Sequence, residues 1–317
     1  MVWDRTRVIG CAALALTAAC EGELESPGQL VLVVDTDMAI PAQLDSLLLE
    51  IEAQGDTQYK HDFDLGPTRA TLPATLTLVS RDIGDDPVSI RVAASKLGDD
   101  GIEWRLFREA VSRVPRDRIA TLRMPLQWLC KGQAEVVSDG DDSPLRPDDV
   151  RSTCKSGETC RAGSCQTSEV ELESLPDYRP EDLYGGGETP EAGSCFDTVG
   201  CMQDARPVAP DARCTFARPA ADRFNVALRV VDDGICDADA EHCYVPLNAD
   251  DPEGWSLEGE RVKLPSAVCD KLREGAVNDV LVSETCKRKT EKVPVCGPWS
   301  DVPKGKAGEY RPRGGGA

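Results

Sequence analysis

The chain has 317 residues, with 56 Asp or Glu against 36 Lys or Arg, and its formal net charge at pH 7 is -20. A chain with this much negative charge repels the phosphate backbone of nucleic acids, so we do not expect nucleic acid as a partner. The length allows two domains of ordinary size.

The first nineteen residues have the composition of an export signal. Arg5 and Arg7 precede an apolar run over residues 8–19 that closes on small side chains. The run is too short to span a bilayer as a stable helix, and no later segment is long and apolar enough to do so. The sequence therefore predicts a signal peptide over residues 1–19.

The signal ends in Leu16-Thr-Ala-Ala-Cys20, which resembles the lipobox of bacterial lipoproteins. In that family a diacylglyceryl group is added to the cysteine thiol before the signal is cleaved. The resemblance implies lipidation at Cys20 and an anchor in the cell envelope, at the outer membrane or cell surface, facing the periplasm or the exterior. Thr17 departs from the usual Leu or Val. The alternative is an ordinary secretory signal that leaves Cys20 as a thiol or bridged.

Residues 20–29 carry no core-forming pattern and are expected to be a solvated tether. Several acyl chains on one cysteine hold a protein at a membrane far more firmly than one chain does. The layout of the whole chain also resembles uncharacterised cysteine-rich surface lipoproteins of Gram-negative bacteria. That likeness assigns no activity.

Of the fourteen cysteines, Cys11 leaves with the signal and Cys20 takes lipid. An even set remains, and in an exported chain this predicts up to six disulfides formed in an oxidising compartment. The disulfide candidates are Cys130, Cys154, Cys160, Cys165, Cys195, Cys201, Cys214, Cys236, Cys243, Cys269, Cys286 and Cys296.

The connectivity of these cysteines stays open at the level of sequence. The close pairs Cys195/Cys201 and Cys236/Cys243 could each close a short loop. A zinc site is disfavoured, because no two cysteines are separated by two residues and histidines at ligand spacing are missing.

The cysteines also divide the chain, because residues 21–129 contain none. Residues 30–129 contain short segments of strand character separated by turn signals, the pattern of an immunoglobulin-like or transthyretin-like sandwich. Strands are expected at 30–34, 47–54, 60–65, 75–79, 88–94, 102–107 and 120–128.

The remainder is expected to be a disulfide-rich, loop-rich β region. Residues 130–215 form a cysteine-rich acidic linker region, which buries too little apolar surface to fold without its bridges. Residues 216–299 are expected to form a disulfide-stapled β-rich domain, and 300–317 a disordered tail. In the stapled domain strands are expected at 224–231, 244–247, 261–264 and 279–282, and a helix at 266–274 with Ser266 as its cap.

Motifs for catalysis are missing from the sequence. His61 lies on the apolar side of a predicted strand, where a core histidine is expected, and His242 is next to Cys243. No Gly-x-Ser-x-Gly elbow exists to accompany either histidine, and there is no phosphate-binding loop or His-Glu-x-x-His helix. A pair of carboxylates for glycoside hydrolysis need only meet in space, so this kind of site stays open.

A weak calcium candidate lies in the loop between Cys236 and Cys243. Asp237, Asp239 and Glu241 occupy alternate positions there, as ligands of one hard cation can. A second stretch, with Asp139 and Asp141, has part of this spacing. Neither matches an EF-hand loop, so solvated acidic loops are the default, and we expect no bound metal and no cofactor.

These observations favour a non-catalytic binding or structural module of the cell envelope, anchored through its lipid. The expected partners are the membrane and a protein or cell-surface polymer. Two alternatives remain: an extracytoplasmic hydrolase with a carboxylate-pair site, and an accessory subunit of an envelope assembly.

Overall fold

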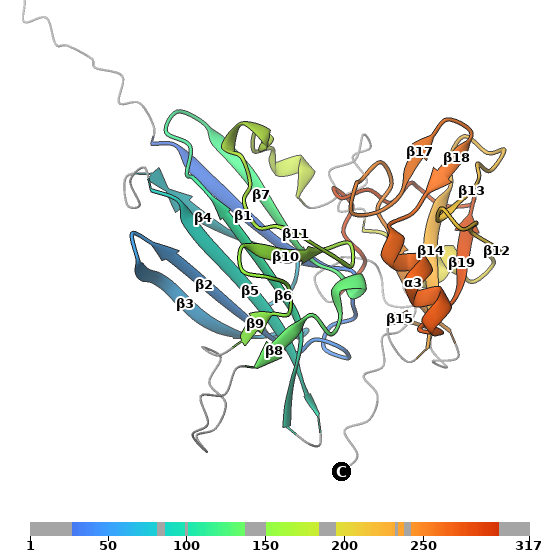
Figure 1. The fold of residues 1–317 in the computed structure, drawn as a ribbon, viewed down its shortest axis with the longest axis horizontal. Helices are drawn as coiled ribbons and strands as arrows, with labels where there is room; N and C mark the ends of the chain where they lie inside the picture. The colour runs from blue at the N-terminus through green and yellow to red at the C-terminus, as the bar shows by residue number, and fades with distance from the viewer. Residues whose placement is uncertain are drawn as a thin grey trace, which may run out of the picture.

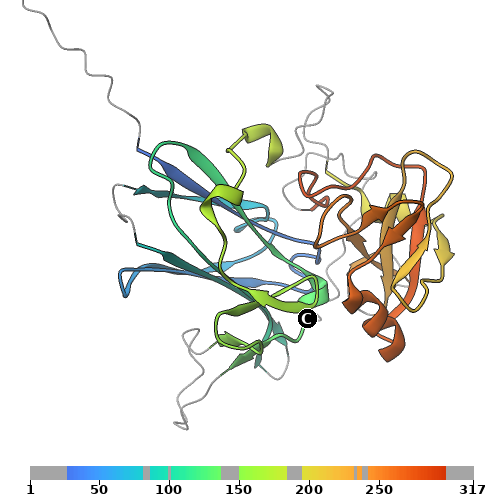
Figure 2. The same ribbon diagram turned by 45° about the horizontal axis from the view of Figure 1, so that its top comes forward.

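The computed structural model describes residues 27–80, 86–98, 101–136, 150–183, 195–231, 234–237 and 242–297. The predicted signal, Cys20, most of the tether and the predicted tail lie outside these residues. The fold is mainly β, as predicted. Figures 1 and 2 show a larger β-sandwich beside a smaller β unit, which holds the C-terminal helix.

All seven strands predicted for the first unit are present. The fifth and sixth strands form a hairpin, with the turn residues 99 and 100 outside the described residues. The strands are β1 (Gln29–Thr36), β2 (Ser46–Ala53), β3 (Asp56–Asp64), β4 (Ala74–Val79), β5 (Val88–Gly98), β6 (Gly101–Ser112) and β7 (Ile119–Leu126).

The seven strands form two facing sheets. One has the order β4-β1-β7, with β1 antiparallel to β4 and parallel to β7, and the other has the order β3-β2-β5-β6. Immunoglobulin domains instead place their first, second, fifth and fourth strands in one sheet. The strand order therefore differs from that of an immunoglobulin domain and leaves the transthyretin-like alternative.

Strand β1 is buried on both faces, as its continuous apolar run predicts. Leu30 and Leu32 face the main core, while Val31 and Val33 pack on the opposite side with Leu183. A central strand of this kind needs a cover on its outer face. That cover comes from the chain that follows the sandwich.

Residues 150–183 are attached to the sandwich by backbone hydrogen bonds. Val111 N donates to Ser168 O at 2.8 Å, and Val170 N donates to Val111 O at 2.9 Å. Tyr178 N donates to Ile119 O at 2.8 Å. The elements of this stretch are β9 (Val150–Ser152), β10 (Glu158–Arg161), β11 (Ser164–Thr167), η3 (Leu172–Ser174) and η4 (Pro180–Asp182). Strand β10 pairs with β11, and β9 pairs with the preceding strand β8 (Ala134–Val136).

The twelve candidate cysteines form six disulfides. The Cys236–Cys243 loop forms, whereas Cys195 and Cys201, which could have closed a second short loop, do not pair with each other. The chain returns beside residue 196 near its end, where Phe196 N donates to Pro294 O at 2.8 Å, and this supplies other partners. The bonds are Cys130–Cys160, Cys154–Cys165, Cys195–Cys296, Cys201–Cys286, Cys214–Cys269 and Cys236–Cys243.

The second unit contains a five-stranded sheet in the order β12-β19-β14-β16-β15 and a three-stranded sheet in the order β13-β18-β17. Its four predicted strands are present, as β14, β16, β18 and β19. The elements are α2 (Thr198–Met202), β12 (Arg206–Val208), β13 (Thr215–Ala217), β14 (Asn225–Val230), β15 (Ile235–Cys236), β16 (Cys243–Leu247), β17 (Ser256–Glu258), β18 (Arg261–Lys263), α3 (Ser266–Glu274) and β19 (Val277–Ser283).

Helix α3 has its predicted bounds but a different cap. Ser266 is the first helical residue, and Pro265 occupies the cap position without a side-chain hydrogen bond. Proline suits the start of a helix because its missing N–H has no partner there in any case. At the other end Gly275 adopts φ +78°, which ends the helix in the left-handed conformation that glycine tolerates best.

The two units share one hydrophobic core. Leu126 and Trp128 from the sandwich side belong to the same buried cluster as Phe224 and Trp255 of the second unit. Lys271 of α3 also lies over the Trp128 ring, 5.0 Å from its centroid. The junction between the units is therefore a packed interface, and its polar residues form the candidate site.

Candidate functional site

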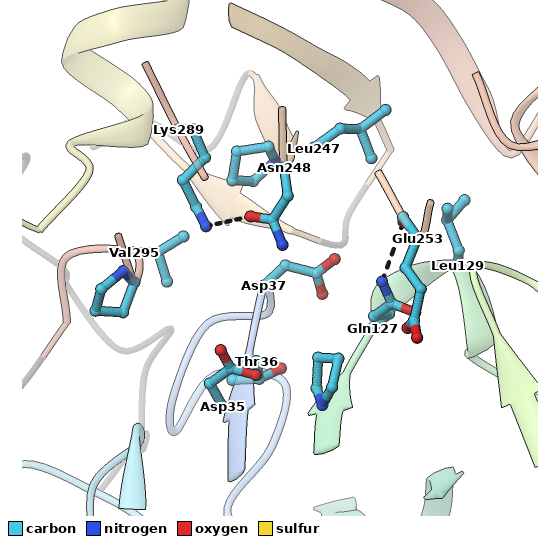
Figure 3. A pocket seen from close by; sticks show the side chains of 13 residues that line it. Asp35, Thr36, Asp37, Gln127, Leu129, Leu247, Asn248, Glu253, Lys289 and Val295 are labelled. Atoms are coloured by element: carbon cyan, nitrogen blue, oxygen red, sulfur yellow. Dashed lines mark hydrogen bonds between the residues drawn. The ribbon is translucent and has the colours of Figure 1, made fainter. Parts of the chain in front are cut away.

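A small hollow of about 30 Å³ lies where the sandwich meets the second unit (Figure 3). The end of β1 and the turn after β7 form one side of it, and the chain after β16 and near the C-terminal end forms the other. The lining residues are Asp35, Thr36, Asp37, Pro125, Gln127, Leu129, Pro246, Leu247, Asn248, Glu253, Lys289, Pro294 and Val295.

Glu253 anchors the junction. Its carboxylate accepts two hydrogen bonds from Arg108 of β6, each 3.0 Å long, and one from Arg161 Nε at 2.6 Å. Arg108 and Glu253 are only 6% and 8% exposed. Burial opposes ionisation of Glu253, but the two arginines outweigh it and hold its pKa below the ordinary value. The carboxylate therefore stays charged and bridges the two units.

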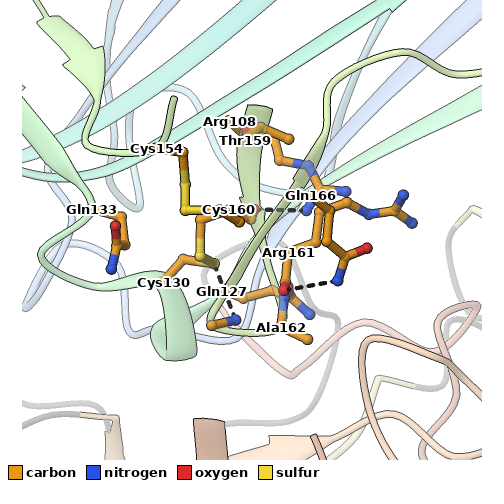
Figure 4. The surroundings of a disulfide bond; sticks show 12 residues. Arg108, Gln127, Cys130, Gln133, Cys154, Thr159, Cys160, Arg161, Ala162 and Gln166 are labelled. Atoms are coloured by element: carbon orange, nitrogen blue, oxygen red, sulfur yellow. Dashed lines mark hydrogen bonds between the residues drawn. A yellow bond between two sulfur atoms is a disulfide. The ribbon is translucent and has the colours of Figure 1, made fainter. Parts of the chain in front are cut away.

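The hairpin formed by β10 and β11 holds these arginines in place, as Figure 4 shows. Strand β10 carries both Cys160, which is bonded to Cys130, and Arg161. Arg108 donates to the carbonyl of Cys160 at 3.1 Å, and the side chain of Gln127 donates to the Glu253 carbonyl at 3.2 Å. The Cys130–Cys160 disulfide thus fixes the hairpin that presents Arg161.

Two aspartates follow the buried run of β1 and face the hollow. Asp37 accepts a 2.7 Å hydrogen bond from the backbone N–H of Trp128, yet burial raises its pKa to about 7. Burial also raises the pKa of Asp35, although Arg123 lies 3.9 Å from its carboxylate and opposes the shift. Asp37 is therefore close to half-protonated at neutral pH.

Lys289 reaches the hollow from the second unit. Its Nζ donates to Asn248 Oδ1 at 2.6 Å and to Thr290 O at 3.1 Å, and only 6% of the residue is exposed. Burial lowers the pKa of Lys289 to about 8, although Asp35 and Asp37 partly offset this effect. An amine of this kind loses its proton far more readily than a surface lysine.

Perturbed carboxyl and amine groups in one hollow are the usual mark of acid–base chemistry. The size of the hollow decides what they can act upon. A volume of about 30 Å³ holds roughly one or two water molecules, whereas small-molecule sites measure about 300 to 1,000 Å³. A sugar ring or a peptide does not fit between these groups.

The predicted functional residues are not part of this junction. His61 is exposed, so the expectation of a core histidine is wrong. It lies on the edge strand β3, in which no residue is fully buried, and its ring contacts Phe63 with 4.6 Å between centroids. His242 is exposed as well.

The calcium candidates are only partly described. Asp237 lies in the described chain, where its side chain accepts from His242 N at 3.4 Å. Its two predicted companions Asp239 and Glu241, and the second pair Asp139 and Asp141, lie outside the described residues. Within the described ranges no group of three His, Cys, Asp or Glu side chains could hold a metal ion.

Sequence reasoning did not find the junction residues. Asp35 and Asp37 follow the apolar run of a buried strand, and this place in the sequence could have marked them as candidates. Glu253 and Lys289 are more than two hundred residues further along the chain, so the sequence does not show that they meet these aspartates. Nothing in the local sequence of either residue distinguishes it from a solvated surface charge.

Comparison with protein family models, with curated proteins and with solved structures finds no match to this chain. Among the helices of the described residues, none has the length and apolar character needed to cross a membrane.

The raised pKa of Asp37 makes stability depend on pH. A carboxyl whose folded pKa is about 7 and whose unfolded value is near 3.8 stabilises the fold fully below pH 4. This contribution is lost as the pH rises through 7, by up to about 4 kcal/mol. The variant Asp37→Asn keeps the acceptor for Trp128 and cannot titrate.

We therefore expect urea unfolding to show the wild type losing stability relative to Asp37→Asn between pH 4 and pH 8. Asp177→Asn is a suitable control, because Asp177 is exposed and pairs with Arg118 at the surface. Parallel stability profiles for the wild type and Asp37→Asn would show that the junction does not perturb Asp37.

Proposed function

We propose that the protein is a lipid-anchored, extracytoplasmic module of the cell envelope that binds another envelope protein and is not an enzyme. The lipobox-like segment ending at Cys20 supports the anchor. The six disulfides support an oxidising compartment. The observation that carries the binding role is the open edge strand β3.

Strand β3 pairs with β2 on one side, and no described strand pairs with its other side. Leu65 N donates to Asp45 O next to β2, whereas Asp64 O accepts from Ala70 N on the outer side. Backbone groups alternate between the two sides of a strand. Asp62 therefore presents its N–H and C=O groups outward, where an added strand would pair.

The side chains along this edge also suit a partner strand. Tyr59, His61 and Phe63 form an aromatic row, with ring centroids 6.3 and 4.6 Å apart along the strand. The exposed Asp62 alternates with this row and offers a negative charge to the neighbouring strand. Addition of a strand to an open edge draws affinity from the backbone and specificity from alternate side chains. The occupant is accordingly an extended segment of another protein.

The hydrolase alternative has weaker support. It needs two carboxylates with room for a sugar between them, and the junction hollow holds little more than water. An accessory subunit of an envelope assembly is compatible with strand addition, because such a subunit also works by binding its neighbours.

The anchor is tested by Cys20→Ser. Without the thiol no acyl chain can be attached, so the variant should move from the membrane fraction to the soluble fraction, as followed by immunoblotting after cell fractionation. Thr17→Leu is the matched control, because it brings the segment closer to the lipobox pattern and should stay with the membrane. Retention of Cys20→Ser in the membrane would contradict the anchor.

The edge strand is tested by Asp62→Pro beside Asp62→Ala. Proline removes the outward N–H and its ring blocks an incoming strand, and edge strands tolerate it. Alanine keeps the backbone donor.

After co-purification from solubilised envelopes, quantitative mass spectrometry should find partner recovery reduced at least about tenfold for Asp62→Pro. Recovery with Asp62→Ala should remain near that of the wild type. Equal recovery with both variants would contradict strand addition at β3. Equal loss with both would assign the binding to the carboxylate of Asp62 and not to the backbone.

A further inference from the structure

The side chains of Lys289 and Asn248 lie in contact, in the arrangement of an amine and an amide that could react. The 2.6 Å hydrogen bond joins the amine Nζ to the side-chain amide oxygen of Asn248. A carbonyl bond is about 1.2 Å long, so the amine lies within about 4 Å of the amide carbon. This is close to the separation from which a nucleophile attacks a carbonyl group, about 3 to 3.5 Å.

The backbone fixes both residues. Ala249 N donates to Lys289 O at 2.8 Å, and Lys289 N donates to the side chain of Asn225 at 2.6 Å. The amide nitrogen of Asn248 donates to Asp251 Oδ2 at 3.0 Å, which sets the orientation of the amide plane. Both side chains therefore meet in one geometry.

Asp37 completes the arrangement from the other unit. It lines the same hollow as Lys289 and Asn248, and all three are labelled in Figure 3. A buried carboxyl beside an amine and an amide can accept a proton from the first and donate one to the second. A lysine, an amide and a proton carrier are the groups needed to make an amide bond.

We propose that Lys289 and Asn248 become covalently joined by an amide bond within the folded chain, with Asp37 as the residue that carries the proton. The bond would cross-link the chain after β16 to the segment that follows β19. This inference rests on the junction alone and does not depend on the anchor or on the edge strand.

The charge states of the groups suit the reaction. The attacking amine must be neutral, and burial lowers the pKa of Lys289 to about 8 while it raises that of Asp37 to about 7. With values about one unit apart, transfer of a proton from the amine to the carboxylate is disfavoured only about tenfold. An exposed pair with ordinary values would disfavour it by more than a millionfold.

The step balances without an oxidant or another reactant. The lone pair of Lys289 Nζ forms a bond to Asn248 Cγ while protonated Asp37 donates a hydrogen bond to the amide oxygen. Asp37 then gives its proton to the amide nitrogen, the original C–N bond breaks, and ammonia leaves. The Asp37 carboxylate takes up the surplus proton of the attacking nitrogen. The product is a secondary amide, Asp37 ends in its starting state, and the departing ammonia is the size of the water that the hollow accommodates.

Aminolysis of an amide is slow between free molecules, so holding the reactants together is the decisive contribution. Well-oriented groups in one molecule reach effective concentrations of about 10⁵ to 10⁸ M. Because folding brings Asp37 to the second unit, the reaction would occur only after the two units have docked.

The test is mass spectrometry of the full chain after folding, reduction of disulfides and protease digestion. The expected result is a branched peptide that joins the segment with Asn248 to the segment with Lys289 and is lighter than their sum by one ammonia molecule. The two separate peptides should be nearly absent. Recovery of both peptides unmodified from folded protein would overturn the proposal.

Variants identify the role of Asp37. Asp37→Asn should abolish the branched peptide, while Asp35→Asn, at the neighbouring carboxyl of the hollow, should retain it. Circular dichroism and urea unfolding establish that each variant is folded. A folded Asp37→Asn protein that still forms the branched peptide would overturn the assignment of Asp37.

Discussion

The structure depends on one carboxylate, that of Glu253, held between Arg108 and Arg161 at the junction of the two units. Charges that are buried to this degree are stable only when they are paired and hydrogen-bonded. Removal of one partner would leave the others uncompensated in a buried interface, at a cost of about 3 to 5 kcal/mol. The pairing therefore selects one relative position of the units more than it adds to stability.

The consequences of that position appear around the hollow. Docking brings the end of β1 against the chain near Lys289, so that Asp37 and Lys289 are buried together and their pKa values approach each other. The same docking leaves a space no larger than about one or two waters. Chemistry at this junction is therefore confined to the chain itself, and contact with other molecules falls to the outer surface, where β3 is open.

Sequence patterns predicted the strands and the helix, because these elements depend on local periodicity. The seven strands of the sandwich, four strands of the second unit and helix α3 follow from alternation and apolar runs. His61 was misplaced because alternation shows which face a residue lies on but not whether that face is covered. The connectivity of Cys195 and Cys201 stayed open because disulfide partners depend on where distant segments return. The junction charges were missed for the same reason.

The central claim is that Glu253 makes the two units fold as one. Hydrogen exchange of β5 in the sandwich and of β14 in the second unit, both in wild type and in Glu253→Gln, tests this most directly. The account predicts equal opening free energies for the two strands in the wild type, and a fall of about 3 to 5 kcal/mol in both for the variant. A fall confined to β14, with β5 unchanged, would contradict it.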